Sequence, residues 1–181
     1  VLAYALGGLE AAPVLLGTPV SLVGLGALTT AITVTFFYVL MLDAWRVRFG
    51  RHYGWFAYLL LATAGLRLVL MAFPANEWGN VVPPQPWSLI RNAPLTLLGL
   101  GVAYLILRDA RATHDTTFLW IGRMILVSYA CYLPVVLFVQ RMPLLGMLMI
   151  PKTLAYVAIA VIAYRGLYTQ PATIDHSPAT A

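Results

Sequence analysis

Residues 144–164 read LLGMLMIPKTLAYVAIAVIAY, and Lys152 is the one charged side chain among them. About 20 residues is the length that an α-helix needs to cross a hydrocarbon core of roughly 30 Å. Apolar residues occupy every side of such a helix rather than one stripe, which is typical of a helix surrounded by lipid or by other apolar groups. The stretch therefore predicts a transmembrane helix with a lysine inside it.

Four other apolar runs have a similar length and composition. They are Val20–Leu42, Trp55–Phe73, Ser88–Leu107 and Phe118–Val139. None shows the alternation over about ten residues that marks the strands of a membrane β-barrel. We therefore predict an all-α, polytopic transmembrane helical bundle with five to six spanning helices. The sixth helix would be the shorter run Val1–Leu16, which carries Glu10 and Pro13, and a re-entrant or interfacial segment is the alternative.

The composition agrees with a membrane protein. Hydrophobic residues make up 61% of the 181 residues and charged residues only 9%, whereas about a quarter of the residues of a typical soluble domain are charged. The length suits one compact bundle, so we predict a single domain over residues 1–168 and a polar, disordered cytoplasmic tail over residues 169–181. The net charge of +5 does not indicate nucleic-acid binding, because no basic patch is interleaved with aromatic residues.

The connectors between the runs indicate the orientation of the chain in the membrane. Residues 43–54 and 108–117 are rich in arginine, and Arg165 follows the last run. Residues 74–87 contain no lysine or arginine, and residues 140–143 contain Arg141 alone. Basic connectors stay on the cytoplasmic side of a membrane. We therefore predict a multi-pass protein of the cell (inner or plasma) membrane with a cytoplasmic C-terminus.

Five ionisable side chains lie inside the apolar runs, namely Glu10, Arg67, Arg91, Arg123 and Lys152. A charged group at the centre of a spanning helix costs about 2.5–3.5 kcal/mol on insertion scales and usually faces the protein interior or water. At 1.5 Å per residue, Arg67 and Glu10 lie roughly 9 Å, and Lys152 roughly 12 Å, below the predicted outer surface. Arg91 is near the outer start of its helix, whereas Arg123 is near the inner face, where it can extend to water. Four of the five charges thus fall in the outer half of the bundle, on four helices.

This coincidence predicts an outward-facing cationic pocket that binds or transports a small anionic or amphiphilic ligand or a lipid headgroup. The candidate ligand-binding residues are Lys152, Arg67, Arg91, Glu10, Asn92, Tyr129 and Tyr132. In this hypothesis the cations bind the ligand and Glu10 balances part of their charge. Residues 88–92 are expected to open their helix and to place free backbone N–H groups beside Arg91. Pro151 is expected to free the carbonyl of Met147 within the last helix.

Two other functions are open on the same residues. Glu10 would form a buried ion pair with Arg67 or Lys152 in a non-catalytic accessory, structural or sensory subunit of a larger membrane complex. Alternatively, the arginines would clamp the phosphate of a lipid substrate in a membrane enzyme, although no catalytic base accompanies them.

The sequence predicts no catalytic residue, metal site or cofactor. The three histidines lie in polar segments outside the apolar runs, and Cys131 is the one cysteine, which is too few ligands for a metal cluster. Neither an HExxH nor a GxSxG motif occurs. The predicted partners are the lipid bilayer, a lipid or small anionic ligand, and a protein partner or a second copy of the chain. Nucleic acid is not among them.

Overall fold

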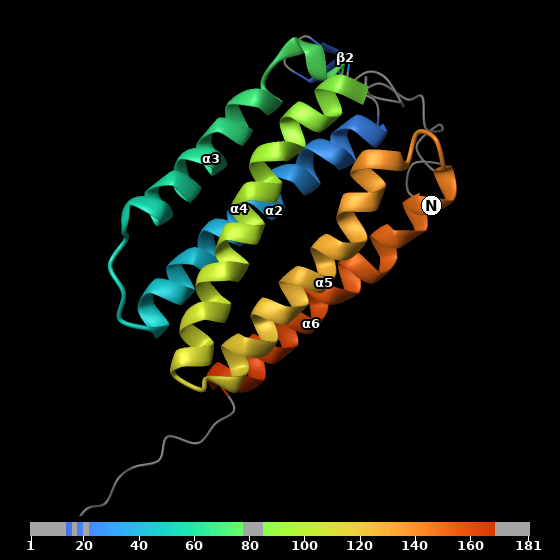
Figure 1. Ribbon diagram of the computed structural model, residues 1–181. Coiled ribbons are helices and arrows are strands. Elements are labelled where there is room, and N and C mark those ends of the chain that lie inside the picture. The colour runs from blue at the N-terminus through green and yellow to red at the C-terminus, as the bar shows by residue number, and fades with distance from the viewer. Residues whose placement is uncertain (1–13, 16–17, 20–21, 78–84, 169–181) are drawn as a thin grey trace, which may run out of the picture.

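The computed structural model describes residues 14–15, 18–19, 22–77 and 85–168 (Figure 1). Five α-helices account for most of them: α2 (Leu22–Arg48), α3 (Trp55–Met71), α4 (Gln85–Ala112), α5 (Thr116–Phe138) and α6 (Met149–Tyr168). Two short 3₁₀ helices precede α4 and α6, namely η1 (Pro74–Asn76) and η2 (Pro143–Leu148). Two strands of two residues each, β1 (Val14–Leu15) and β2 (Thr18–Pro19), pair antiparallel ahead of α2.

The prediction of an all-α membrane bundle is confirmed. Within the described residues, four helical segments are long and apolar enough to cross a membrane: Gly24–Arg48, Pro86–Ala112, Thr116–Phe138 and Leu144–Gly166. α3 is apolar but has 17 residues, the lower end of the spanning range. In the run proposed as a sixth helix, Val14 and Leu15 form strand β1 rather than helix, and residues 1–13 lie outside the described part of the chain.

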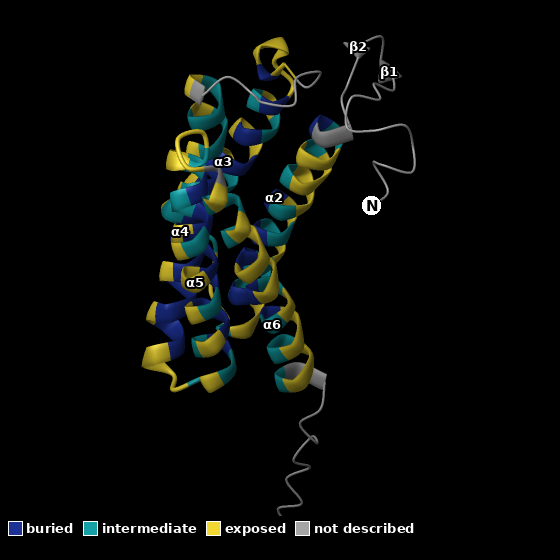
Figure 2. Cartoon of the chain, turned by 90° about the vertical axis from the view of Figure 1, so that its right-hand side faces the viewer, coloured by how far each residue is buried: buried dark blue, intermediate teal, exposed yellow. Residues whose placement is uncertain are grey.

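The core forms where α4 contacts α3 on one side and α5 on the other, while α6 packs on α5 (Figure 1). Half of the apolar segment of α4 is buried, against only 17% in each of α2 and α6. Figure 2 shows that these two helices carry much of the exposed surface on the side drawn there. Their exposed residues are themselves apolar, for example Phe36, Leu40, Ile150 and Leu154. Such a surface suits contact with lipid rather than water.

The two ends of the bundle differ in composition. We call the end formed by η1 and η2 the η end. We call the opposite end the arginine end, because Arg46, Arg48 and Arg165 lie in the last turns of their helices there and Arg51 follows in the connector. Side chains at the arginine end are tied together by carboxylates, whereas the buried charges at the η end are cations.

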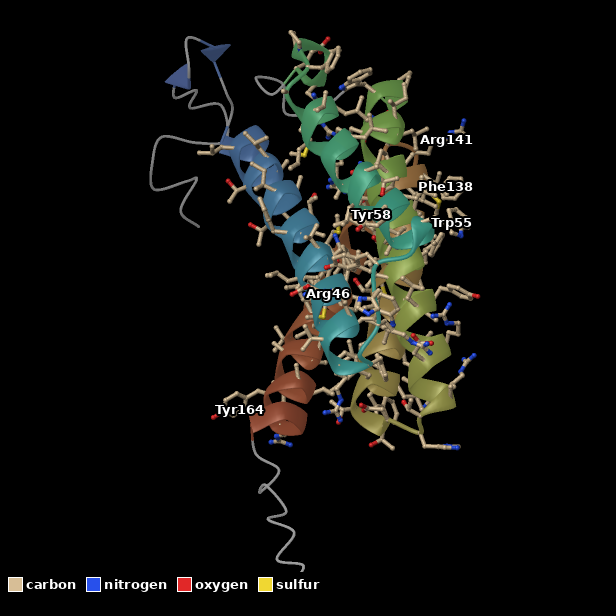
Figure 3. All side chains as sticks on the ribbon, turned by 90° about the vertical axis from the view of Figure 1, so that its left-hand side faces the viewer. Arg46, Trp55, Tyr58, Phe138, Arg141 and Tyr164 are labelled. Atoms are coloured by element: carbon tan, nitrogen blue, oxygen red, sulfur yellow. The ribbon has the colours of Figure 1, made fainter. Side chains whose placement is uncertain are left out.

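α3 covers α4 from the η end only as far as Tyr104 and leaves the last two turns of α4 uncovered. Its first turn packs at Phe56 against Tyr104, with ring centroids 6.3 Å apart, and α4 continues beyond Tyr104 to Ala112. The connector of residues 49–54 fills this interval, rising along the bundle from the end of α2 (Figure 1). Figure 3 accordingly shows Trp55 and Tyr58 partway along the bundle rather than at its end. Trp55 is 79% exposed and Tyr58 60%, as expected for aromatic residues at a membrane interface.

Two predictions about helix starts were wrong. α6 begins at Met149, which places Pro151 in its first turn, where backbone N–H groups have no acceptor within the helix. Pro151 therefore removes no hydrogen bond to Met147 from the middle of a helix. Likewise, α4 begins at Gln85 rather than Ser88, with Pro86 as its second residue. Arg91 lies in the second turn, beyond the free N–H groups.

A close contact between α4 and α5 depends on Gly99. A Cβ atom at this position would overlap the ring and hydroxyl of Tyr129. Because Gly99 has no side chain, the Tyr129 hydroxyl reaches α4 and donates a hydrogen bond of 2.7 Å to the carbonyl of Leu95. The glycine thus allows a buried tyrosine to satisfy its hydroxyl on the neighbouring backbone.

We predict that Gly99→Ala destabilises the protein by about 1–3 kcal/mol, because the added methyl group displaces Tyr129. Gly65→Ala is the matched control, because Gly65 also lies within a helix and a Cβ there meets no atom within 4 Å. The control should be neutral or stabilising by up to about 1 kcal/mol, since alanine favours a helix over glycine. Thermal unfolding in detergent, followed by circular dichroism, measures both variants. Equal stability of the two variants would contradict the packing described for Tyr129.

Candidate functional site

Three cations converge at the η end from three helices: Arg67 of α3, Arg91 of α4 and Lys152 of α6. We call them the cationic cluster. Arg67 is 3% exposed and Lys152 is 8% exposed, while Arg91 is half-buried. Arg67 lies within electrostatic range of both other cations. Each lies within two turns of the η end of its helix, so the helices bring like charges to one level of the bundle.

Tyr132 of α5 lies at the centre of the cationic cluster. The Nζ atom of Lys152 is 4.2 Å from the centroid of its ring, and the ring of Tyr156 is 5.9 Å from the same atom. Arg67 and Arg91 both interact electrostatically with Tyr132. The negative face of an aromatic ring attracts a cation, and the attraction grows to about 2 kcal/mol when the pair is removed from water. Tyr132 therefore compensates part of the charge of Lys152.

The guanidinium group of Arg67 is incompletely bonded. Its Nε and Nη1 atoms are buried and have no hydrogen-bond partner. Among the described residues, no carboxylate lies within 4 Å of Arg67 or of Lys152. A buried charged group that lacks both hydrogen-bond partners and an opposite charge lowers the stability of the folded protein. Arg67 therefore has two buried N–H groups that no described residue accepts a hydrogen bond from.

Arg91 is anchored to the end of α3. Its Nη1 atom donates to Oδ1 of Asn76 at 3.1 Å. The Nδ2 atom of Asn76, a residue with no exposed surface, donates in turn to the carbonyls of Leu70, Met71 and Phe73. These carbonyls belong to the last turn of α3 and the residues after it, where a helix has no internal donors left. Asn76 thus joins the C-terminus of α3 to the arginine on α4.

Four tyrosines form a group that extends from the cationic cluster toward the middle of the bundle. They are Tyr38 of α2, Tyr129 and Tyr132 of α5, and Tyr156 of α6. The hydroxyls of Tyr38 and Tyr156 are 3.0 Å apart and share a hydrogen bond. The rings of Tyr38 and Tyr129 are 5.8 Å apart, as are those of Tyr129 and Tyr132. The group links three helices through a continuous aromatic layer.

The structure brings together five of the seven residues predicted for the site: Arg67, Arg91, Lys152, Tyr129 and Tyr132. Asn92 does not join them through any described contact, because its Nδ2 atom donates to Ser88 O on its own helix at 2.8 Å. Glu10 lies outside the described residues, so its pairing with either cation stays a prediction. Arg123, predicted to extend to water, is exposed and lies over the ring of Trp120 at 5.1 Å.

Sequence reasoning missed several residues around the site: Tyr38, Asn76, Trp87, Ser128 and Tyr156. Spacing along the helices was the available signal, because residues four apart share a helix face. Tyr156 lies four positions after Lys152, Trp87 four before Arg91, and Ser128 four before Tyr132. Trp87 Nε1 and Ser128 Oγ are buried polar atoms without a hydrogen-bond partner. Tyr38 and Asn76 had no such signal, because tertiary packing alone brings them to the cluster.

The arginine end provides a contrast, because its buried charge is fully paired. Asp109 is 2% exposed and accepts hydrogen bonds from Trp45 Nε1 at 2.9 Å and from Arg108 at 2.9 and 3.0 Å. Arg51 adds an ion pair at 3.3 Å. The carboxylate therefore ties the end of α2 and the following connector to α4.

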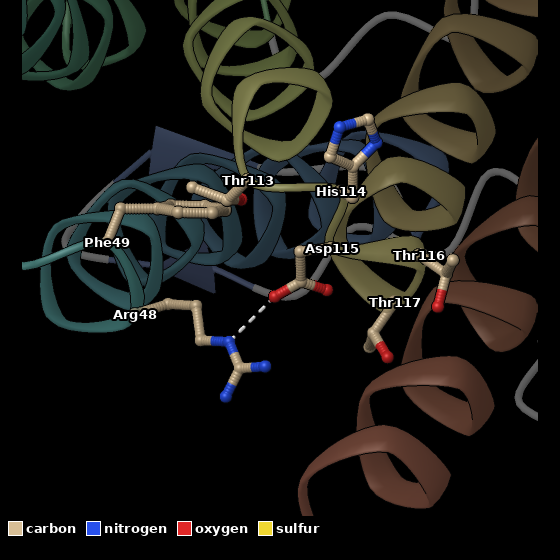
Figure 4. A pocket seen from close by; sticks show the side chains of 7 residues that line it. All are labelled: Arg48, Phe49, Thr113, His114, Asp115, Thr116 and Thr117. Carbon is tan, nitrogen blue, oxygen red and sulfur yellow. Dashed lines mark hydrogen bonds and ion pairs between the residues drawn. The ribbon is translucent and has the colours of Figure 1, made fainter.

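A hollow of about 530 Å³ also opens at the arginine end, between the end of α2 and the α4–α5 turn (Figure 4). Two of its charged side chains are hydrogen-bonded to each other: Arg48 Nε donates to Asp115 at 2.8 Å. Asp115 also accepts from the backbone N–H of Phe118 and so caps α5. Arg48 and Asp115 therefore stabilise the local structure around the hollow.

Comparisons with protein families, with curated proteins and with solved structures found no match. In the described part of the chain, no group of three or more His, Cys, Asp or Glu side chains is placed to hold a metal ion. The cationic cluster is therefore the candidate site on the strength of its own geometry.

We predict that Asp109→Asn destabilises the protein by about 2–3 kcal/mol, because it replaces a buried carboxylate that accepts charged hydrogen bonds. Asp43→Asn is the control. Its ion pair with Arg46 is about half exposed, and pairs of that kind contribute at most about 1 kcal/mol. Thermal unfolding of both variants in the same detergent provides the comparison. A loss at Asp109 no larger than that at Asp43 would show that the buried pairing is not important for stability.

Proposed function

We propose that the cationic cluster is a binding site for an anionic or amphiphilic small molecule or a lipid headgroup. The observation that carries this proposal is Arg67, a guanidinium that is 3% exposed with its Nε and Nη1 atoms unbonded. Lys152 lies beside it with aromatic rings as its described contacts. An anion at this point would accept hydrogen bonds from Arg67 and offset the repulsion between the two cations.

The proposed site faces outward. The arginine-rich connectors lie at the opposite end of the bundle, and such connectors stay on the cytoplasmic side. The η end, where the cationic cluster lies, is then the outer end. On this orientation the ligand enters from the outer leaflet or from the outside solution, and the C-terminus of α6 lies in the cytoplasm. Binding alone and binding followed by transport both fit this site.

The surface around the cluster suits an amphiphilic ligand. Residues next to the cations along their helices point away from the core and are apolar: Leu66 and Val69 are 51% and 57% exposed, and Ile90 is 48% exposed. Ile150 and Leu154, on either side of Lys152, are each 61% exposed. A ligand whose charged end reaches the cluster can therefore leave its apolar part in contact with these residues and the surrounding lipid.

We predict that Arg67→Met abolishes anion binding and stabilises the protein by about 1–3 kcal/mol, because it removes an unpaired buried charge. The purified chain in dodecyl maltoside is titrated with dodecyl phosphate and with dodecanoate by calorimetry, and thermal unfolding is measured without either probe. Arg123→Met is the matched control, since Arg123 is exposed and distant from the cluster along α5. It should bind the probes as the parent protein does.

Two outcomes would reject this proposal. If neither probe binds the parent protein, the cluster is not an anion site. If Arg67→Met lowers stability and leaves binding unchanged, Arg67 serves packing, as in a buried ion pair of an accessory subunit. Lys152→Met provides the same comparison from the other helix if the Arg67 variant does not fold.

Lys152 allows an independent test, because it is the one lysine of the chain. We predict that an amine-reactive acetylating reagent modifies Lys152 slowly, and at least five-fold more slowly with saturating dodecyl phosphate, because the bound anion covers the ammonium group. Mass spectrometry of the peptide that contains Lys152 measures the rate. The Arg67→Met variant should lose this protection. Equal rates with and without the probe in the parent protein would place the anion elsewhere.

A further inference from the structure

We infer that the anionic group bound by the cationic cluster is a phosphate monoester or free phosphate dianion rather than a carboxylate. This inference rests on the proposed function, and it identifies the chemical class of the ligand at the same site. Two features of the described residues carry it: the number of unbonded donors and the number of positive charges.

The donors outnumber the oxygen atoms of a carboxylate. Arg67 presents two unbonded nitrogen atoms, Nε and Nη1. Their N–H bonds point outward from different edges of the planar guanidinium group. Lys152 adds an ammonium group with three N–H donors and no described hydrogen bond. A carboxylate supplies two oxygen atoms in one plane, so it leaves some of these donors buried and unbonded. A phosphate monoester supplies three terminal oxygen atoms that point in three directions.

The charges also favour a dianion. Arg67 and Lys152 together carry two positive charges, and no carboxylate lies within 4 Å of either among the described residues. A carboxylate would offset only one of these charges and leave the other to the aromatic rings alone, in a site removed from water. A phosphate monoester carries about −1.5 to −2 at pH 7, which balances the pair.

Trp87 supports an acceptor-rich ligand. Its Nε1 atom is a further buried donor without a partner, one helical turn from Arg91 on the same face of α4. An indole N–H only donates hydrogen bonds, so an oxygen acceptor is the group that this atom can bond. Arg67 and Trp87 thus both have buried N–H groups that an oxygen acceptor would satisfy.

The test compares ligands with the same dodecyl chain at pH 7, in dodecyl maltoside and with the full chain. Dodecyl phosphate is mainly a dianion, dodecanoate a monoanion, and dodecylphosphocholine a phosphodiester with no net charge. We expect dodecyl phosphate to bind at least ten-fold more tightly than either of the others. Inorganic phosphate is the fourth probe. Competition with dodecyl phosphate at similar affinity indicates free phosphate as the source, and at least ten-fold weaker binding indicates a phosphorylated amphiphile. Both outcomes support the phosphate chemistry.

Arg67→Lys supplies the matched variant, because it keeps the charge and removes the planar set of donors. We expect it to bind dodecanoate within about three-fold of the parent and to lose most of the preference for dodecyl phosphate. Arg123→Lys, at the exposed site on α5, should change neither affinity. If the parent protein binds dodecanoate as tightly as dodecyl phosphate, the phosphate inference is wrong while anion binding stands. If none of the four probes binds, the proposed function itself is wrong.

Discussion

The constraint on which this structure depends is the burial of Arg67 and Lys152 in a bundle whose outer surface is apolar. Each cation removed from water needs compensation from its surroundings, and the described residues supply it through aromatic rings and dipoles rather than through carboxylates. Tyr132 lies against Lys152, and Asn76 fixes Arg91 to the end of α3. The compensation is incomplete at Arg67, and this deficit is the physical basis of the proposed site.

The two ends of the bundle show two ways to manage buried charge. At the arginine end, Asp109 is surrounded by donors from Trp45, Arg51 and Arg108, so the charge is neutralised within the protein and ties local structure together. At the η end, Arg67 and Lys152 lie at one level, and no carboxylate of the described residues lies within 4 Å of either. Fully paired charge gives rigidity, whereas unpaired charge of one sign gives affinity for the opposite sign. This difference separates the structural end of the bundle from the end that we propose binds a ligand.

Composition was sufficient to predict the helical class, because five apolar runs of about 20 residues admit few other structures in a membrane. The cations inside the helices could also be predicted, because the positions of charges within apolar runs can be read from the sequence. Tyr132 was among the predicted binding residues, but the contact of its ring with Lys152 is visible only in the folded chain. The start of α6 could not be placed, since Pro151 is compatible with either the middle or the first turn of a membrane helix. Asn76 could not be assigned either, because its role comes from contacts with the last turn of α3 and with Arg91, which only the folded chain brings together.

The shortness of α3 affects the membrane as well as the protein. With 17 residues it extends for roughly 25 Å, less than the roughly 30 Å of an average hydrocarbon core. The neighbouring helices are longer, so the apolar girdle of the bundle is narrower on the side of α3 than elsewhere. Lipids bordering this side must shorten or tilt to match it, at a cost of a fraction of a kcal/mol per ångström of mismatch. We therefore expect the lipid shell of this protein to be thinnest beside α3, the helix that carries Arg67.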